Sequence, residues 1–208
     1  MTAVDAVPTD FDWRTYPDPP IAPILAAALT HFQQDGYHGT TVRKIAAEVG
    51  LTMPTLYYHY GNKEGLLFAL LDIAMDDFWA HGHACLEEAG TDVQKRFENF
   101  ISSVALHYTH RRDLAMLHDE SRFLGPDFRV KYLERRNMVN EVLEGLIKDG
   151  VAEGVFDVDD SHLTSLALLG MLGGILDWYR DKGPLSAADI ANRYTRYAVR
   201  IVSKPAAA

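Results

Sequence analysis

The chain has 208 residues, of which 48 % are hydrophobic, and its formal net charge is −9 at pH 7. This composition is typical of a globular protein with a sizeable core, and it excludes a disordered chain. The acidic balance argues against a protein that binds nucleic acid over its whole surface. The single cysteine, Cys85, permits no internal disulfide. With no signal-peptide pattern and no membrane-spanning run, we expect a cytoplasmic protein without a membrane partner.

Residues 1–17 are rich in proline and aspartate, and we expect them to form a flexible arm. The first helix is predicted to begin near Ala22, because Pro23 is tolerated only in a first turn. Its apolar residues follow the helical period, and Gly36 is suited to end it.

Two short helices follow, joined by a glycine turn. Thr40 or Thr41 can cap the first of them, which ends at Gly50, and Thr52 can cap the second. Short helix, glycine turn and short helix is the arrangement by which a protein places a rigid probe in the major groove of DNA. The pattern therefore predicts a helix-turn-helix motif over residues 41–60.

The rest of the chain carries helical periodicity interrupted by glycine and Gly-Pro breaks, without a convincing strand or repeat. The further helices are predicted at 63–88, 92–110, 112–123, 127–149, 160–182 and 187–203. The fold class is therefore all-α with about nine helices. We expect a three-helix DNA-binding domain over residues 18–78 and a larger helical domain for effector binding and dimerisation over residues 79–208.

The second helix of the motif cannot be explained by core packing alone. Leu56 and Tyr60 can pack inward, which leaves hydroxyl, aromatic and basic groups for phosphate oxygens and methyl groups for thymine. An amphipathic helix pair with half-buried tyrosines is the alternative. The predicted DNA-binding residues are Thr40, Thr41, Arg43, Lys44, Thr52, Met53, Pro54, Thr55, Tyr57, Tyr58, His59 and Lys63.

A longer pattern runs from the first helix to the start of the fourth. It consists of Phe32, Gly36-Tyr37, Thr40-Thr41-Val42, Ile45-Ala46, Gly50-Leu51, Leu56-Tyr57-Tyr58-His59-Tyr60, Lys63-Glu64 and Leu67. In this order and spacing it resembles the DNA-binding domain of the tetracycline-repressor (TetR) family of bacterial regulators. Pro54 departs from the pattern, since glycine is common at that position.

The resemblance implies a non-enzymatic, ligand-responsive repressor that binds double-stranded operator DNA as a homodimer and needs no cofactor. An all-helical small-molecule-binding protein or enzyme without DNA binding remains the alternative. Two C-terminal helices with apolar stripes resemble the pair that forms the dimer interface in this family; one monomeric core would also explain them. The interface residues are predicted to be Leu166, Gly170, Gly174, Ile190, Tyr194, Tyr197 and Ile201.

A pocket for a small hydrophobic effector, such as an acyl-CoA or a lipid or aromatic metabolite, is expected among the middle helices. Ordinary core packing would also explain its candidate residues, which combine bulk with a polar or polarisable atom. They are Trp79, His83, Phe97, Ile101, Val104, His107, Tyr108, Met116, Phe123, Met138, Met171 and Trp178.

Basic residues between the middle helices are candidates for the phosphates of such an effector, although a solvated face of Glu-Arg pairs is the alternative. They are Arg111, Arg112, Arg122, Arg129, Lys131, Arg135 and Arg136. Histidines at 81, 83, 107 and 110 do not match a recognised zinc spacing, and we predict no metal site.

Overall fold

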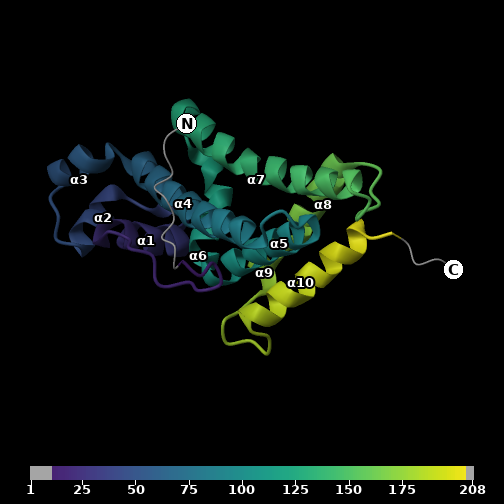
Figure 1. Ribbon diagram of the computed structural model, residues 1–208. Coiled ribbons are helices and arrows are strands. Elements are labelled where there is room, and N and C mark those ends of the chain that lie inside the picture. The colour runs from purple at the N-terminus through teal and green to yellow at the C-terminus, as the bar shows by residue number, and fades with distance from the viewer. Residues whose placement is uncertain (1–10, 205–208) are drawn as a thin grey trace. The chain divides into compact units, whose positions relative to one another are not determined.

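The computed structural model describes residues 11–204, and all regular structure in that range is helical (Figure 1). The predicted all-α class is therefore confirmed. The expectations for residues 1–10 and 205–208 lie outside the described residues. No helix between residues 11 and 204 is both long and apolar enough to cross a bilayer.

The N-terminal helices begin where their capping residues predict, but the first helix continues past Gly36, its predicted end, to Gly39. Gly36 adopts a φ of 69° and interrupts the first helix. The hydroxyl of Thr41, rather than that of Thr40, caps the second helix, and Thr52 caps the third. Asn62 Oδ1 accepts a hydrogen bond from Gly65 N at 2.9 Å and so caps the fourth. The bounds are α1 (Pro23–Gly39), α2 (Val42–Glu48), α3 (Met53–Tyr60) and α4 (Lys63–Ala89).

Farther along the chain, two helices predicted as continuous are each divided. The segment 112–123 turns from α-helix to 3-10 helix at Met116, where histidine, aspartate and serine are weak helix formers. The segment 160–182 is interrupted at Gly173 and Gly174, because adjacent glycines weaken a helix. The bounds are α5 (Val93–His110), α6 (Arg112–Ala115), η1 (Met116–Phe123), α7 (Pro126–Ala152), α8 (Ser161–Gly173), α9 (Ile175–Trp178) and α10 (Ala187–Val202).

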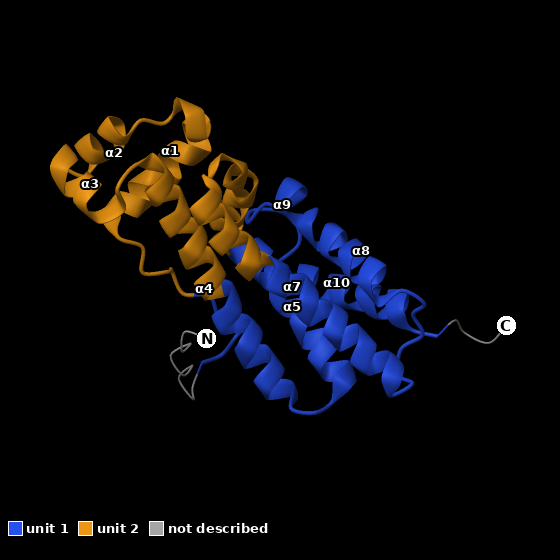
Figure 2. Cartoon of the chain, turned by 90° about the horizontal axis from the view of Figure 1, so that it is seen from above, with its two compact units in different colours: residues 1–16, 78–110, 137–208 blue, residues 17–77, 111–136 orange. Residues whose placement is uncertain are grey.

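The described residues divide into two compact units (Figure 2). Unit 1 contains residues 11–16, 78–110 and 137–204, and in its core α10 packs along α5. Unit 2 contains residues 17–77 and 111–136, so that α6, η1 and residues 126–136 of α7 join the three N-terminal helices and the start of α4. The chain therefore crosses between the units after residues 16, 77, 110 and 136, and the division into domains at residue 78 stays a prediction.

Residues 11–16 form an ordered strap on unit 1, so the expectation of a flexible arm does not hold for them. Trp13 is only 2 % exposed, and its carbonyl accepts a hydrogen bond from His81 Nδ1 at 2.7 Å. The ring of Tyr16 stacks on His81 at 3.9 Å and on His110 at 4.7 Å between centroids. Burial of these rings explains why the strap is fixed.

Glu88 anchors the strap through its carboxylate. Both Nη atoms of Arg14 lie 2.7 Å from it, and Trp13 Nε1 donates to it at 2.9 Å. These hydrogen bonds, first that of Arg14, lower the pKa of Glu88 from 4.5 to about 2.

Replacing Glu88 by glutamine is expected to lower the free energy of unfolding by about 1 kcal/mol at pH 7, since a half-exposed pair contributes little more. Because the folded state lowers this pKa, the contribution is complete above pH 4.5 and is lost as the pH falls towards 2. Urea unfolding at several pH values measures the difference, with the neighbouring exposed Glu87→Gln as control. A difference that persists unchanged below pH 4 would contradict the role of the carboxylate.

Candidate nucleic-acid interface

The helix pair α2–α3 is held together by a small apolar contact surface within unit 2. Ile45 and Leu56 are fully buried, and Ala46 is 2 % exposed. Gly50 adopts a φ of 66°, which allows the sharp turn between the two helices. Leu51 N donates to Ala46 O at 2.9 Å and closes this turn. The predicted helix-turn-helix motif is therefore present, with α3 as its second helix.

One face of α3 carries aromatic and hydroxyl groups that the unit does not bury. Tyr58 is 86 % exposed and Tyr57 is 49 % exposed. The hydroxyls of Thr52 and Thr55 lie 2.8 Å apart at the start of the helix. The predicted contact residues with exposed or partly exposed side chains are Thr41, Arg43, Lys44, Thr52, Met53, Pro54, Thr55, Tyr57, Tyr58 and His59.

Few positive charges accompany these groups. Lys44 Nζ lies 3.4 Å from Asp35 Oδ2, which partly neutralises it. Arg43 is exposed and forms no ion pair within residues 11–204. This surface is therefore suited to bind phosphates chiefly through hydroxyl and backbone donors, with Arg43 as its main charge.

Two of the predicted contact residues form hydrogen bonds inside unit 2. Thr40 is 1 % exposed, and its hydroxyl lies within 2.9 Å of the carbonyl oxygens of His31 and Gly36. We therefore leave the Thr40 side chain out of the candidate interface. Lys63 Nζ donates to Tyr37 O at 2.6 Å and to Thr40 O at 2.9 Å. Partial burial lowers the pKa of Lys63.

The Lys63 side chain therefore ties the start of α4 to the last turn of α1 and to Thr40, which follows it. Replacing it by methionine is expected to lower the free energy of unfolding by about 1–3 kcal/mol, because two carbonyls lose a charged donor. Operator binding should fall with it, as the helix pair loses its support. Thermal melting and DNA titration measure the two effects. Lys44→Met, at an exposed lysine of the same surface, is the control for thermal melting. Unchanged stability with weakened DNA binding would instead indicate a direct phosphate contact.

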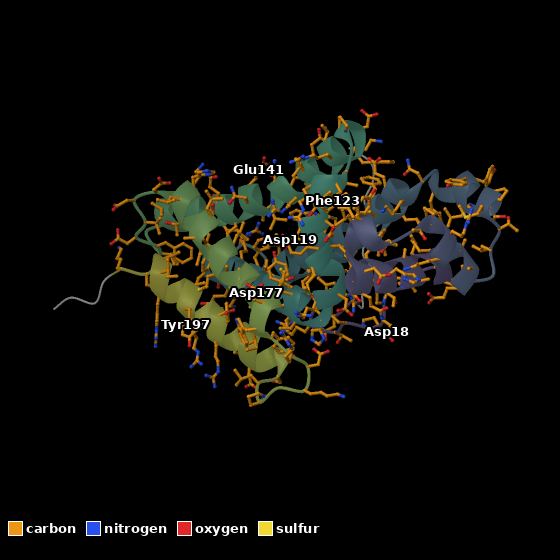
Figure 3. The ribbon with its side chains drawn as sticks, turned by 180° about the vertical axis from the view of Figure 1, so that it is seen from behind. Asp18, Asp119, Phe123, Glu141, Asp177 and Tyr197 are labelled. Carbon is orange, nitrogen blue, oxygen red and sulfur yellow. The ribbon has the colours of Figure 1, made fainter. Side chains whose placement is uncertain are left out.

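The candidate effector residues are divided between the two units. Ten of them belong to unit 1, whereas Met116 and Phe123 belong to unit 2. Phe97, Ile101 and Val104 are fully buried. The ring of Phe123, at the end of η1 (Figure 3), stacks on Tyr37 at 5.2 Å.

Most of the other candidates are either buried in the core of unit 1 or exposed on its surface. Trp79 and His107 are 6 % and 1 % exposed, whereas Met138 and Trp178 are 44 % and 46 % exposed. His83, Tyr108 and Met171 are intermediate. A groove of about 620 Å³ exists in unit 1, but none of the candidates lines it. It is lined by Trp13, Arg14, Glu98, Asn99, Ser102, Asp189, Asn192, Arg193, Thr195 and Arg196.

The basic residues offered for effector phosphates are not all available. Arg111 pairs with Asp77, its Nε lying 3.1 Å from the carboxylate. Arg135 pairs with Asp72 and Asp76. These two arginines are therefore committed to aspartates of α4.

An apolar surface is exposed on the last long helices of unit 1. Leu163 and Leu166 of α8 are 62 % and 46 % exposed, and Ile201 of α10 is 49 % exposed. Tyr197, which Figure 3 labels on α10, is 45 % exposed. Ile190 is 1 % exposed, so this predicted interface residue belongs to the core of its own unit. Leu163, which was absent from the predicted interface, is the most exposed of the set. Such a patch is typical of a protein–protein contact.

No group of three or more metal-ligating side chains lies together anywhere in residues 11–204. Cys85 is fully buried, and burial raises the pKa of its thiol to about 12. This thiol is therefore unsuited to act as a nucleophile or a metal ligand at neutral pH.

Two family models match the chain. The one described as "Tetracyclin repressor-like, C-terminal domain" matches residues 90–202. The one described as "Bacterial regulatory proteins, tetR family" matches residues 24–70, which include α2 and α3. The matched ranges therefore include both the helix pair and the exposed apolar surface.

Comparison with individual proteins gives the same result as the family models. The chain is 28 % identical to the "HTH-type transcriptional repressor KstR2" of Mycobacterium tuberculosis over 172 residues, which cover 82 % of this chain and 85 % of the repressor. The crystal structure of the TetR family transcriptional regulator PfmR from Thermus thermophilus is similar with a TM-score of 0.77 and 29 % identity, covering 86 % of this chain and 98 % of that one. AibR, crystallised with isovaleryl coenzyme A and operator DNA, is similar with a TM-score of 0.73 and 25 % identity, covering 84 % and 95 %.

Proposed function

This chain belongs to the tetracycline-repressor family of bacterial regulatory proteins, and we propose that it represses transcription as a homodimer that releases its operator on binding a small hydrophobic effector. The observation that carries the proposal is the exposed face of α3 on a rigid helix pair. Its aromatic and hydroxyl groups remain largely exposed, Tyr58 most of all, and are suited to duplex DNA. Such a repressor acts in the cytoplasm and needs no catalytic residue.

The exposed surface of α8 and α10 supports the homodimer. A single helix-turn-helix contacts too few phosphates for tight, specific binding, whereas two of them read half-sites one duplex turn apart. Leu163, Leu166, Tyr197 and Ile201 provide the apolar contact that such a dimer needs.

For the effector we propose an acyl-CoA, because the similar protein AibR was crystallised with isovaleryl coenzyme A. A lipid or aromatic metabolite is the other candidate, because the twelve residues predicted to line the pocket are mainly apolar. Release from DNA requires only that the effector bind more tightly to a conformation in which the two α3 helices no longer match the half-sites.

The test is a mobility-shift assay on the DNA upstream of the gene for this protein. The proposal expects specific retention that unrelated DNA does not compete away, and release of the DNA by isovaleryl coenzyme A or another acyl-CoA. Retention without release by any acyl-CoA would support a DNA-binding repressor but would exclude acyl-CoAs as its effectors. Absence of specific retention, together with turnover of a small molecule, would favour an all-helical enzyme instead.

A further inference from the structure

The chain crosses between the two units after residues 16, 77, 110 and 136. These crossings are covalent links through which a change in unit 1 can reach α2 and α3. The contacts among the residues of unit 2 that flank the crossings therefore influence whether unit 2 moves as one rigid body or changes conformation only near one crossing. Two arginines connect these flanking residues to one another.

Arg111 is the first residue after one crossing, and it is 6 % exposed. Its Nε and Nη2 lie 3.1 and 3.2 Å from the two carboxylate oxygens of Asp77, the last residue before another crossing. Its Nη2 also donates to the carbonyl of Pro17 at 2.5 Å, directly after a third crossing. One guanidinium thus joins the unit 2 ends of three crossings.

Arg135 lies one residue before Arg136, which is the last residue of unit 2 before the fourth crossing. Its Nη1 donates to Asp72, and its Nη2 donates to Asp76 at 2.5 Å. Both aspartates lie in the part of α4 that directly precedes the crossing after residue 77. All of these contacts are inside unit 2.

We propose that Arg111, Arg135, Asp72, Asp76 and Asp77 form an arginine clasp that makes the unit 2 ends of all the crossings one rigid piece. The bidentate pair of Arg111 with Asp77 and the fork of Arg135 between Asp72 and Asp76 fix geometry as well as distance, which a lysine in the same place would not do. Ion pairs of this kind contribute more to a unique arrangement than to net stability. The clasp residues are positioning residues: they orient α2 and α3 for the operator without contacting it.

The DNA readout of this proposal rests on the proposed function, so a second readout is independent of DNA. The test compares Arg135→Gln with Arg136→Gln, which removes the same charge from the next residue of α7; Arg136 is exposed and forms no ion pair within residues 11–204. Amide hydrogen exchange is measured over residues 63–77 and 111–136, followed by operator titration. Asp76→Asn, at an exposed carboxylate, is the second variant, because it removes one clasp contact without leaving a buried charge unpaired.

Arg135→Gln and Asp76→Asn are expected to accelerate exchange in both segments and to weaken effector-free operator binding about tenfold, the usual size of a coupling between sites. Arg136→Gln should change the affinity less than about twofold, because an exposed, unpaired charge has little effect here. Equal exchange in Arg135→Gln and Arg136→Gln would overturn the clasp. So would weaker DNA binding without faster exchange, which would indicate a direct charge effect. If the unchanged protein binds no operator, the proposed function fails, but exchange still decides whether the clasp exists.

Discussion

Replacing Tyr58 by alanine is expected to weaken operator binding at least tenfold while leaving the melting temperature unchanged. Its side chain is 86 % exposed, and its only aromatic neighbour within the described residues is His59, with ring centroids 5.1 Å apart. Truncation therefore removes almost no packing inside unit 2. A tyrosine in the middle of a recognition helix that contacts the duplex contributes on the order of 1–3 kcal/mol, which corresponds to about 10- to 100-fold in affinity.

Titration of labelled operator DNA and thermal circular dichroism measure the two quantities on the same samples. Tyr58→Phe separates the hydroxyl from the ring: weakening by Tyr58→Phe equal to that by alanine assigns the contact to the hydrogen bond. An alanine variant that binds the operator as tightly as the unchanged protein would remove Tyr58 from the interface.

The helix-turn-helix could be predicted because its signals are local. Thr52 caps the helix that it precedes, and Gly50 has the positive φ that the turn requires. The inward orientation of Leu56 follows from helical spacing within a few residues. For such features, one segment of sequence contains both partners of each interaction.

The internal roles of Lys63 and Trp13 could not be predicted in this way. Lys63 donates to a carbonyl 26 residues earlier, and Trp13 donates to a carboxylate 75 residues later. Neither contact has a periodic signal, because tertiary packing brings the partners together. From sequence alone, a lysine beside a recognition helix indicates a phosphate contact, and a proline-rich N-terminus indicates a flexible arm. Only the residues that lie next to them in the folded chain show their other contacts.

The same limit applies to the division of the chain. Arg111 and Asp77 are 34 residues apart, and their pairing helps to join residues 111–136 to the DNA-binding helices. From sequence alone, Arg111 belonged to a basic cluster suited to an effector phosphate. The choice between these roles depends on which acid the guanidinium reaches, and the helical pattern does not contain that information.

Replacing Leu166 by arginine is expected to convert the dimer into monomers and to weaken operator binding by about a hundredfold or more. Leu166 is 46 % exposed on α8, beside a surface that includes Leu163. An arginine there would bring a charge into the apolar contact proposed for the dimer. Once the two α3 helices are no longer linked, the second half-site contact loses its effective concentration, which is worth about 10²- to 10⁴-fold in affinity.

Sedimentation equilibrium measures the assembly, and titration of operator DNA measures the affinity. His162→Arg is the matched control, because it introduces arginine on the same helix at a side chain that lies 2.8 Å from Glu144 of its own unit. The control should remain dimeric and should bind the operator normally. If Leu166→Arg also remains dimeric, the interface lies elsewhere, and the exposed apolar surface needs another partner. If it is monomeric and yet binds as tightly as before, one helix-turn-helix suffices, and the reason for proposing a dimeric repressor is lost.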